Sequence, residues 1–552
     1  MSTQLNILKV HPADNVLVAL TNLEKGTVVN YEGQDYTIQE LVKAKHKFAT
    51  TDLAIGDSII MYGVLVGKAQ QEIKKGGVIS TSNIKHAAND FTVGDRHTDW
   101  AKPDVSAFSG RTFNGYHRAD GSVGTANYWV VIPMVFCENR NLDVLQQALV
   151  TDLGYGRNRS YQRQSQQLVE LYKAGKSVEQ ILATDLQADY EKGGNERLFP
   201  NVDGIKFLTH DGGCGGTRQD AQALCGLLAG YITHPNVAGA TVLSLGCQNA
   251  QVSMLEEEIK KRSPEFSKPL YILEQQKVGK ESTLLSEAIK QTFAGVILAN
   301  QQTRQPAPLS KLCIGLECGG SDGFSGISAN PAIGYTSDLL VALGGSVILS
   351  EFPELCGVEQ NLSDRCMDVP TAERFSHLMR TYNDRAKAVG SGFDMNPSPG
   401  NIRDGLITDA IKSAGAAKKG GTSPVTAVLD YPEKVSQPGL NLLCTPGNDV
   451  ESTTAEVASG ANIVLFTTGL GTPTGNPVAP VVKIATNSAL FDRMRDIMDI
   501  NTGTIIEGKE TIRQAGERIL DYIIGVASGE TQVAAVRHVQ DDFIPWKRGV
   551  SL

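Results

Sequence analysis

The chain has 552 residues, of which 41% are hydrophobic and 20% are charged, and its formal net charge is -9. This length suits roughly three domains with cores of ordinary size, and the acidic balance argues against nucleic acid as a partner. No apolar run is long enough to span a membrane, so we expect no membrane contact. The absence of a basic, apolar leader and of paired cysteine spacing among the nine cysteines favours a cytoplasmic protein with free thiols.

The first 83 residues predict a small β-rich domain. A strand is expected over residues 15–20, and short β-rich runs separated by glycine turns follow between residues 52 and 80. Residues 84–114 mix charged, aromatic and proline residues without a clear period. We interpret this segment as a linker to the next domain.

From residue 115 onward, apolar runs alternate with helical patterns, which predicts parallel sheets. Strands are predicted near residues 128–136, 205–210, 240–245, 312–316, 345–350, 440–445, 462–467 and 481–485, with helices over 142–149, 219–231 and 252–261. We expect an α/β domain over 115–305, with a polar peripheral insertion at about 154–201, and a second α/β domain over 306–552. The predicted fold class is therefore α/β, with a small N-terminal β-rich domain and a larger body of mostly parallel sheets.

The stretch from Ile314 to Pro331 combines an apolar strand pattern with a glycine-rich turn. The turn carries two acids, one thiol and two hydroxyls, which are Glu317, Asp322, Cys318, Ser321 and Ser325. Glycine allows the backbone to approach a ligand closely and exposes N–H donors. Both a binding site and a plain strand-to-helix turn with a buried cysteine are compatible with this pattern.

Four cysteines share one setting, a turn between a predicted strand and the helix that follows it. They are Cys137, Cys214, Cys247 and Cys318. Parallel sheets bind ligands at the carboxyl ends of their strands, so we expect these thiols to lie near one another and to bind a metal. The alternative for each cysteine is a small buried hydrophobic residue.

Several motifs occur in the order found in one enzyme family. They are Glu317 to Gly326, Asn396 to Asn401, Thr445 to Asp449 and Lys483 to Asn487, with residues 46–49 and 59–69 of the N-terminal part. On these motifs the chain resembles the altronate/galactarate dehydratase family, with its small N-terminal SAF domain, over nearly its whole length apart from the insertion. The resemblance implies removal of water from an aldonic or aldaric acid, with ferrous iron as activator. For altronate the product would be 2-dehydro-3-deoxy-D-gluconate, and galactarate is the alternative substrate.

The sequence leaves the form of the metal open. The alternatives are Fe²⁺ on oxygen and nitrogen ligands, Mn²⁺ in its place, and an iron–sulfur cluster held by thiolates. Many members of the family carry a pair of histidines near the end of the SAF domain, where this chain has Ser80 and Ser82. His46 and His86 are therefore the candidate metal ligands in this part of the chain.

Dehydration requires a base for the proton next to the carboxylate, an acid for the leaving hydroxyl and a cation for the charge that develops. His210 and Lys483 are the candidate bases, Lys483 is also a candidate cation, and Asp322 is the third catalytic candidate. The candidates for substrate binding are Ser321, Ser325, Asn330, Asn401, Asn448, Asp449, Thr486 and Asn487. Helix capping and turn formation are the alternative roles of such residues.

Two other functions compete with that of a dehydratase. A sugar-acid binding protein without activity would use the same polar strand ends, but the density of acids, thiols and lysine favours an enzyme. A nucleotide-dependent oxidoreductase is disfavoured, because Gly469-Leu470-Gly471 lacks the third glycine of a dinucleotide fingerprint and no P-loop occurs. The sequence leaves both a monomer and a homo-oligomer open.

Overall fold

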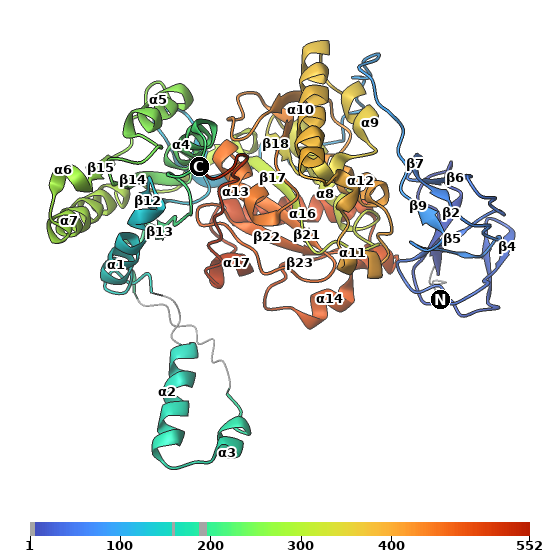
Figure 1. Ribbon diagram of the computed structural model, residues 1–552, viewed down its shortest axis with the longest axis horizontal. Coiled ribbons are helices and arrows are strands. Elements are labelled where there is room, and N and C mark those ends of the chain that lie inside the picture. Colours follow the sequence, from blue (N-terminus) through green and yellow to red (C-terminus); the bar gives the residue numbers. More distant parts are fainter. Residues whose placement is uncertain (1–5, 157–159, 187–195) are drawn as a thin grey trace.

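The computed structural model describes residues 6–156, 160–186 and 196–552. Figure 1 shows a β-rich N-terminal domain at one side of a larger α/β body. The body contains a four-stranded and a seven-stranded parallel sheet, which confirms the predicted fold class. Within the described residues, no helix is both long enough and apolar enough to cross a membrane.

Short antiparallel strands build the N-terminal domain. The largest sheet has the order β1-β2-β5-β8 and consists of β1 (Ile7–Leu8), β2 (Val16–Ala19), β5 (Lys47–Ala49) and β8 (Val78–Ile79). A second sheet contains β6 (Ser58–Met61), β7 (Val64–Ala69) and β9 (Ile84–Lys85), and β3 (Val28–Tyr31) pairs with β4 (Gln34–Thr37). Leu17, Ile38 and Phe48 form the centre of one small core, so this domain buries apolar residues of its own.

The first parallel sheet of the body has the order β13-β12-β14-β15. Its strands are β12 (Tyr128–Pro133), β13 (Gly204–Phe207), β14 (Val237–Ser244) and β15 (Leu270–Glu274). Its helices are α1 (Asn139–Val150), α4 (Arg218–Thr233), α5 (Val252–Arg262), α6 (Gln275–Val278) and α7 (Glu281–Ala299). Along β12, Trp129 and Val131 pack with α1 and α7, whereas Val130 and Ile132 belong to the cluster that contains α4. Both faces are therefore buried, which explains the unbroken apolar run of this strand.

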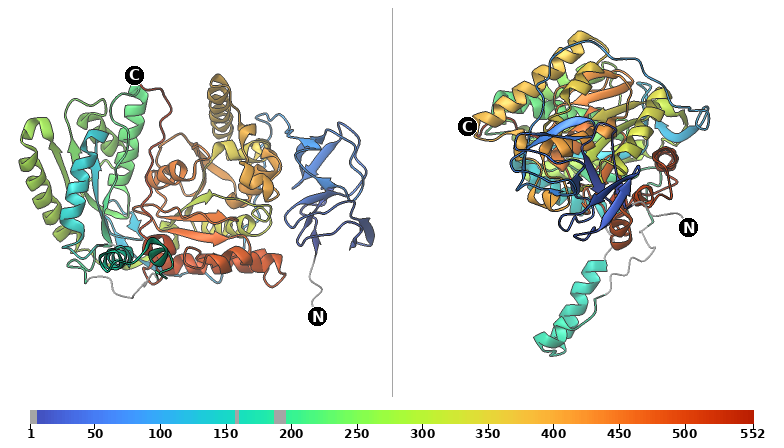
Figure 2. Two further views of the ribbon diagram at one scale, coloured as in Figure 1. Left: turned by 60° about the horizontal axis from the view of Figure 1, so that its bottom comes forward. Right: turned by 90° about the vertical axis from the view of Figure 1, so that its right-hand side faces the viewer.

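The predicted insertion at about 154–201 lies partly outside the described residues. Its described part contains α2 (Ser160–Lys173) and α3 (Val178–Leu182), in which only Ser160 is buried. Both helices project away from the sheets (Figures 1 and 2). They therefore take no part in the site described below.

The second parallel sheet has the order β19-β20-β18-β17-β21-β22-β23. Its strands are β17 (Cys313–Cys318), β18 (Ser346–Leu349), β19 (Val425–Leu429), β20 (Gly439–Leu443), β21 (Ile463–Thr468), β22 (Val481–Ala485) and β23 (Ile500–Asn501). The chain starts in the middle at β17, fills one side through β20, and then returns to the other side of β17 at β21. This reversal makes the carboxyl ends of β17 and β21 a topological switch point, where open parallel sheets bind ligands.

Helices cover the second sheet and join it to the first. Those around it are α8 (Ala329–Ala342), α9 (Glu359–Asp364), α10 (Val369–Ala388), α11 (Pro399–Arg403), α12 (Asp409–Ala416), α13 (Asp449–Ser459), α14 (Ser488–Arg493), α15 (Gly503–Ile506), α16 (Ile512–Ala527) and α17 (Ala534–Arg537). Helix α13 packs on both β17 and α4, so it connects the two sheets.

A small third sheet of the body lies near residues 114 and 305, where two domain boundaries were expected. Strand β10 (Thr112–His117) pairs with β11 (Val123–Gly124) and with β16 (Gln305–Pro308), all antiparallel. It therefore ties the end of the expected linker to the expected junction at residue 305. The domain boundaries themselves stay a prediction.

Candidate active site

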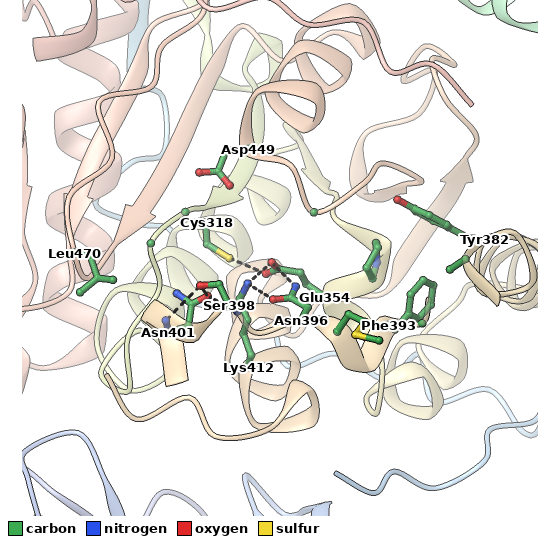
Figure 3. Close-up of a pocket in the computed structure, with 17 residues that line it drawn as sticks. Cys318, Glu354, Tyr382, Phe393, Asn396, Ser398, Asn401, Lys412, Asp449 and Leu470 are labelled. Carbon is green, nitrogen blue, oxygen red and sulfur yellow. Dashed lines mark hydrogen bonds and ion pairs between the residues drawn. The ribbon is translucent and has the colours of Figure 1, made fainter. Parts of the chain in front are cut away.

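A cavity of about 550 Å³ lies at the switch point of the seven-stranded sheet. Figure 3 shows its wall, which carries residues from the turns after β17, β18, β20 and β21. The lining residues include Cys318, Gly319, Gly320, Glu354, Tyr382, Phe393, Asn396, Ser398, Asn401, Lys412, Gly447, Asp449 and Leu470. Polar side chains from distant segments therefore meet where the topology predicts a ligand.

Five potential metal ligands meet at this cavity, three of them in its lining, and we call them the acidic cluster. They are Glu317 and Cys318 at the end of β17, Glu351 and Glu354 after β18, and Asp449 at the start of α13. Ligand atoms of Cys318, Glu351 and Glu354 lie within 4.8 Å of one another. The same holds for Glu317, Glu351 and Asp449, so Glu351 is shared by both groups.

Two buried lysines balance part of this negative charge. Lys419 donates to Glu351 Oε2 at 2.8 Å, and Lys412 forms an ion pair with Glu354. Burial alone would raise the pKa of Glu354, but Lys412 and Lys419 hold it below its ordinary value. Asn396 supports this pair, because its amide donates to Glu354 Oε1 at 3.1 Å and its Oδ1 accepts from Lys412 at 3.0 Å.

Three carboxylate oxygens of the cluster lack such a partner. Both carboxylate oxygens of Glu317 and Oε1 of Glu351 are buried without a hydrogen-bond partner. Burial, followed by the charge of Glu351, raises the pKa of Glu317 well above its ordinary value. Burial likewise raises the pKa of Asp449 to about 7. Unpaired buried carboxylates are costly, and a divalent cation among them would supply the missing partner.

The backbone is arranged to bring these acids together. Glu351 adopts a left-handed conformation with φ 62° and ψ 58°, and its N–H donates to Thr445 Oγ1 at 2.8 Å. Such a conformation is strained for glutamate and is found mostly at functional sites. At position 319 a Cβ atom would lie 1.9 Å from Asp449 Oδ2, so only glycine permits this approach.

Asn401 and Ser398 form the part of the wall that faces the glycine-rich turn. They share a capping box at the start of α11, in which Ser398 Oγ lies 2.9 Å from Asn401 Oδ1. The Asn401 amide donates to the carbonyl of Ser321 at 2.7 Å. Of the predicted substrate-binding residues, Asn401 and Asp449 line the cavity.

Asp322 lies instead in a buried hydrogen-bond network beside the cavity. Its Oδ1 accepts from Ser325 Oγ at 3.1 Å and from Thr486 Oγ1 at 2.9 Å. Its Oδ2 accepts from Asn487 at 3.2 Å and lies 2.9 Å from Lys45 Nζ of the N-terminal domain. Asp322 therefore lies together with three other predicted site residues, Ser325, Thr486 and Asn487, and none of the four lines the cavity.

Three further substrate-binding candidates have other positions. Asn330 donates to the carbonyl of Gly415 at 3.0 Å and accepts from Thr467 at 2.9 Å, and Asn448 caps the N-terminus of α13. These are the structural roles considered for polar strand-end residues. Ser321 Oγ is buried without a hydrogen-bond partner, beside the turn that forms the cavity wall.

The two predicted bases lie outside the cavity. His210 belongs to the first sheet, where one ring nitrogen contacts the carbonyl of Pro133 at 2.8 Å and the other accepts from the N–H of Gly212 at 3.1 Å. Both nitrogens are therefore used by the backbone, and burial lowers the pKa of the ring. Lys483 Nζ donates to the carbonyl of Thr472 at 2.8 Å and lies 4.5 Å from the centre of the Phe466 ring. The structure thus gives both residues packing and hydrogen-bonding roles.

The four cysteines expected to converge are divided between the two sheets. Cys318 is buried at the end of β17, whereas Cys137, Cys214 and Cys247 are exposed in turns after β12, β13 and β14. Backbone hydrogen bonds do connect these three turns, from Phe136 to Gly212 and from Ala250 to Gly213, both at 3.1 Å. Some His, Cys, Asp and Glu residues among those described form groups of three whose ligand atoms lie within 4.8 Å of one another. None of these groups contains Cys137, Cys214 or Cys247. The structure therefore places Cys318 among carboxylates, and a shared metal site of the four thiols stays a prediction.

The two candidate histidines lie at the junction of the N-terminal domain with the body. A ring nitrogen of His46 lies 3.1 Å from the carbonyl of Arg403. His86 has a ligand atom within 4.8 Å of both Cys356 and Asp409. At the position of the family's histidine pair, the hydroxyls of Ser80 and Ser82 lie 2.7 Å apart.

Five residues of the site were not among the catalytic, substrate-binding or metal candidates. Glu317 was noted only as an acid of the glycine-rich turn, and Glu351, Glu354, Lys412 and Lys419 were not considered as site residues. The two glutamates follow a predicted strand, and their position at a strand end was a usable signal. The two lysines have no such signal, because they lie on or after α12 and reach the cluster only through tertiary packing.

Family models match almost the whole chain in three consecutive segments. Residues 5–87 match the altronate/galactarate dehydratase SAF domain, residues 115–300 the second domain of D-galactarate dehydratase/altronate hydrolase, and residues 309–551 the C-terminal domain of D-galactarate/altronate dehydratase. These matches agree with the motifs that carry the resemblance.

Relatives of known activity cover the same length. The chain is 34% identical to altronate dehydratase of Escherichia coli (strain K12) over 545 residues, which is 99% of both chains. It is 33% identical to altronate dehydratase of Bacillus subtilis (strain 168) over 552 residues, 99% of this chain and 100% of that one. It is 31% identical to galactarate dehydratase (L-threo-forming) of E. coli (strain K12) over 530 residues, 95% of this chain and 93% of that one. The chain therefore belongs to the altronate/galactarate dehydratase family of hydro-lyases.

Proposed function

We propose that the protein dehydrates D-altronate to 2-dehydro-3-deoxy-D-gluconate in the cavity above the acidic cluster. The observation that carries this proposal is the meeting of five potential metal ligands and two lysines at the switch point, beside a cavity of about 550 Å³. Such a volume suits a six-carbon acid. The two relatives named altronate dehydratase support this substrate, and the third supports D-galactarate as the second candidate.

The acidic cluster fits a divalent metal ion, which we propose is Fe²⁺ or Mn²⁺. Glu351 belongs to both groups of close ligand atoms, so it would hold the ion either with Cys318 and Glu354 or with Glu317. Several buried oxygens of these residues lack a hydrogen-bond partner. Carboxylates suit Mn²⁺, and the thiol in the same set favours a softer ion such as Fe²⁺. When bound, the metal supplies a Lewis acid for the negative charge that develops on the substrate. An iron–sulfur cluster held by all four predicted cysteines finds no support, because Cys318 is on a different sheet from the others.

Lys412 provides a fixed positive charge at the cavity wall. Its ammonium group is held by Glu354 and Asn396, so it is oriented before the substrate arrives. A preorganised cation of this kind stabilises a carboxylate more strongly as charge moves onto it in the transition state. We therefore assign Lys412 to the substrate carboxylate and Asn396 and Asn401 to its hydroxyls.

Asp449 is the acid that we assign to proton transfer, because it lines the cavity and is not locked into an ion pair with lysine. It takes the proton from C2 of the substrate. The electron pair of the C2–H bond forms the C2=C3 double bond while the C3–O bond breaks, and Asp449 passes the proton it has taken to the C3 hydroxyl, which leaves as water. The resulting enol becomes the 2-keto acid. Substrate atoms are thus divided between one 2-keto-3-deoxy acid and one water molecule.

The test is release of 2-keto acid from D-altronate and D-galactarate by protein purified without oxygen, stripped with a chelator and then supplied with Fe²⁺ or Mn²⁺. We expect product from D-altronate after metal addition, and at least ~10²-fold less product from Glu351→Gln, which lacks the shared ligand. Product from D-galactarate alone would favour the second candidate. No product from either acid, or full activity after rigorous metal removal, would contradict the proposal.

A further inference from the structure

Three potential metal ligands from distant segments also meet outside the acidic cluster. His86 follows β9 at the end of the N-terminal domain, Cys356 follows the short helix at Phe352–Leu355, and Asp409 begins α12. One ligand atom of each residue lies within 4.8 Å of the other two. The group is mixed, with one nitrogen, one sulfur and one oxygen ligand, unlike an exposed patch of acids.

Close backbone packing holds the three segments in place. Gly357 has φ +93°, and a Cβ atom there would lie 3.0 Å from the Cβ of Ala410 and 3.4 Å from the Cβ of Ala88. Each of these residues lies within two positions of one of the three ligands. The N–H of Ala410 also points to Nδ1 of His86 at 3.4 Å. The ligands are therefore brought together by the fold rather than by free rotation of surface side chains.

One oxygen of Asp409 points to a missing partner. Asp409 is 1% exposed, and its Oδ2 is buried without a hydrogen-bond partner, while Oδ1 accepts from Ser413 Oγ at 3.4 Å. An unpaired buried carboxylate oxygen is destabilising. Burial and the negative charge of Glu354 and Glu359 raise the pKa of Asp409, whereas a side-chain hydrogen bond with Cys356 and the charge of Lys412 lower it. The Cys356 thiol therefore already contacts this carboxyl group, and a cation that displaced the thiol proton would bind the sulfur and the carboxylate together.

We propose that His86, Cys356 and Asp409 form a second metal site, which binds a borderline divalent ion such as Zn²⁺ or Fe²⁺. Imidazole, thiolate and carboxylate are ligands that Zn²⁺ accepts together, with a water molecule or a further acid in the fourth position. This site is separate from the proposed catalytic metal and does not depend on the proposed substrate.

The position of this second site gives it a mechanical role. Cys356 lies two residues after Glu354, and Asp409 lies three residues before Lys412, and Glu354 and Lys412 form the ion pair at the cavity wall. His86 is contributed by the end of the N-terminal domain. A metal at the second site would fix both halves of that ion pair relative to the N-terminal domain. His86, Cys356 and Asp409 would act as positioning residues.

The test uses Co²⁺ as a spectroscopic probe in the full chain. Cys318→Ser first removes the thiol of the acidic cluster. In that variant we expect a thiolate-to-Co²⁺ charge-transfer band, which is lost on adding His86→Gln or Asp409→Asn. His97→Gln, which replaces an exposed histidine of the segment that follows β9, is the matched control and is expected to keep the band. Binding of Co²⁺ by the exposed thiols would give a band that His86→Gln leaves unchanged, and this result would overturn the proposal.

Two measurements without Co²⁺ complete the test. After loading with Zn²⁺, elemental analysis is expected to find one equivalent per chain less in His86→Gln than in the wild type. Zn²⁺ is also expected to slow alkylation of Cys356 at least ~10-fold in the wild type and in His97→Gln but not in His86→Gln, because a metal-bound thiolate is withdrawn from reaction. Equal zinc content and equal alkylation rates in all variants would show that the three residues pack together without a metal.

Discussion

Glu317→Gln tests whether the acidic cluster is a metal site or a set of protonated acids that binds no metal. Glu317 is fully buried, both its oxygens lack hydrogen-bond partners, and burial raises the pKa of its carboxyl well above the ordinary value. Without a metal, burial therefore favours the neutral form of this side chain, and glutamine resembles that form in shape and charge. We expect the unfolding free energy of the metal-free protein to change by less than about 1 kcal/mol.

With metal present, the same substitution has a larger effect. A metal at 100 times its Kd stabilises the native state by about 2.7 kcal/mol. Glutamine lacks the negative charge of a carboxylate ligand, so we expect the metal Kd to rise at least ~10-fold, which removes about 1.4 kcal/mol of that stabilisation at the same metal concentration. Activity at limiting metal should fall in parallel.

The assay is urea unfolding of the wild type and Glu317→Gln, each with a chelator and with Mn²⁺. Glu456→Gln is the matched control. Glu456 is equally buried, and burial raises its pKa to about 8, but its Oε1 accepts from Ser350 and from the N–H of Leu316. Glu456 belongs to neither ligand group of the acidic cluster, so we expect Glu456→Gln to keep the stabilisation by Mn²⁺. If Mn²⁺ stabilises Glu317→Gln as much as the wild type, or stabilises neither protein, Glu317 is not a metal ligand.

Three further substitutions test the roles of individual residues. Lys412→Met removes the cation of the cavity wall and should lower kcat/KM at least ~10²-fold, whereas the exposed Lys387→Met should not; equal effects would contradict the assignment. Lys483 has its pKa lowered to about 7 by burial, so the folded state binds fewer protons than the unfolded state from about pH 7 to 10, and stability from this residue rises with pH across that window. Lys483→Met should flatten this dependence and change turnover less than ~10-fold, which unfolding curves and rate assays would check. His210→Gln should destabilise by about 1–3 kcal/mol and leave turnover nearly unchanged, and a large loss of turnover at full stability would restore His210 as a base.

The sequence predicted the strands well where both faces are buried. The apolar runs at residues 128–136, 205–210 and 240–245 correspond to β12, β13 and β14. The sequence-based prediction missed the long helices α7, α10 and α16, for which a helical period of apolar residues is the usual signal. Alternation of strands and helices was therefore enough for the fold class, but not for all elements.

The candidate site could be predicted only as far as strand ends reveal it. Cys318 is the last residue of β17, Asp449 begins the helix that follows β20, and both line the cavity. His210 lies in the turn after β13, which belongs to the other sheet, and which sheet a strand joins depends on long-range pairing that spacing does not encode. Lys412 and Lys419 approach the acids from a separate helical segment, so their charge balance became visible only in three dimensions.

The left-handed backbone at Glu351 has a consequence for protein engineering. Glycine adopts this conformation without strain, whereas other residues lose about 1–3 kcal/mol. Glycine at position 351 would relieve that strain, but it would leave the buried ammonium group of Lys419 without its carboxylate partner, which costs about 3–5 kcal/mol. The same exchange would delete the carboxylate that both ligand groups share. The ion pair and the site therefore both retain the strained glutamate, and a stability screen of this chain is expected to reject glycine there.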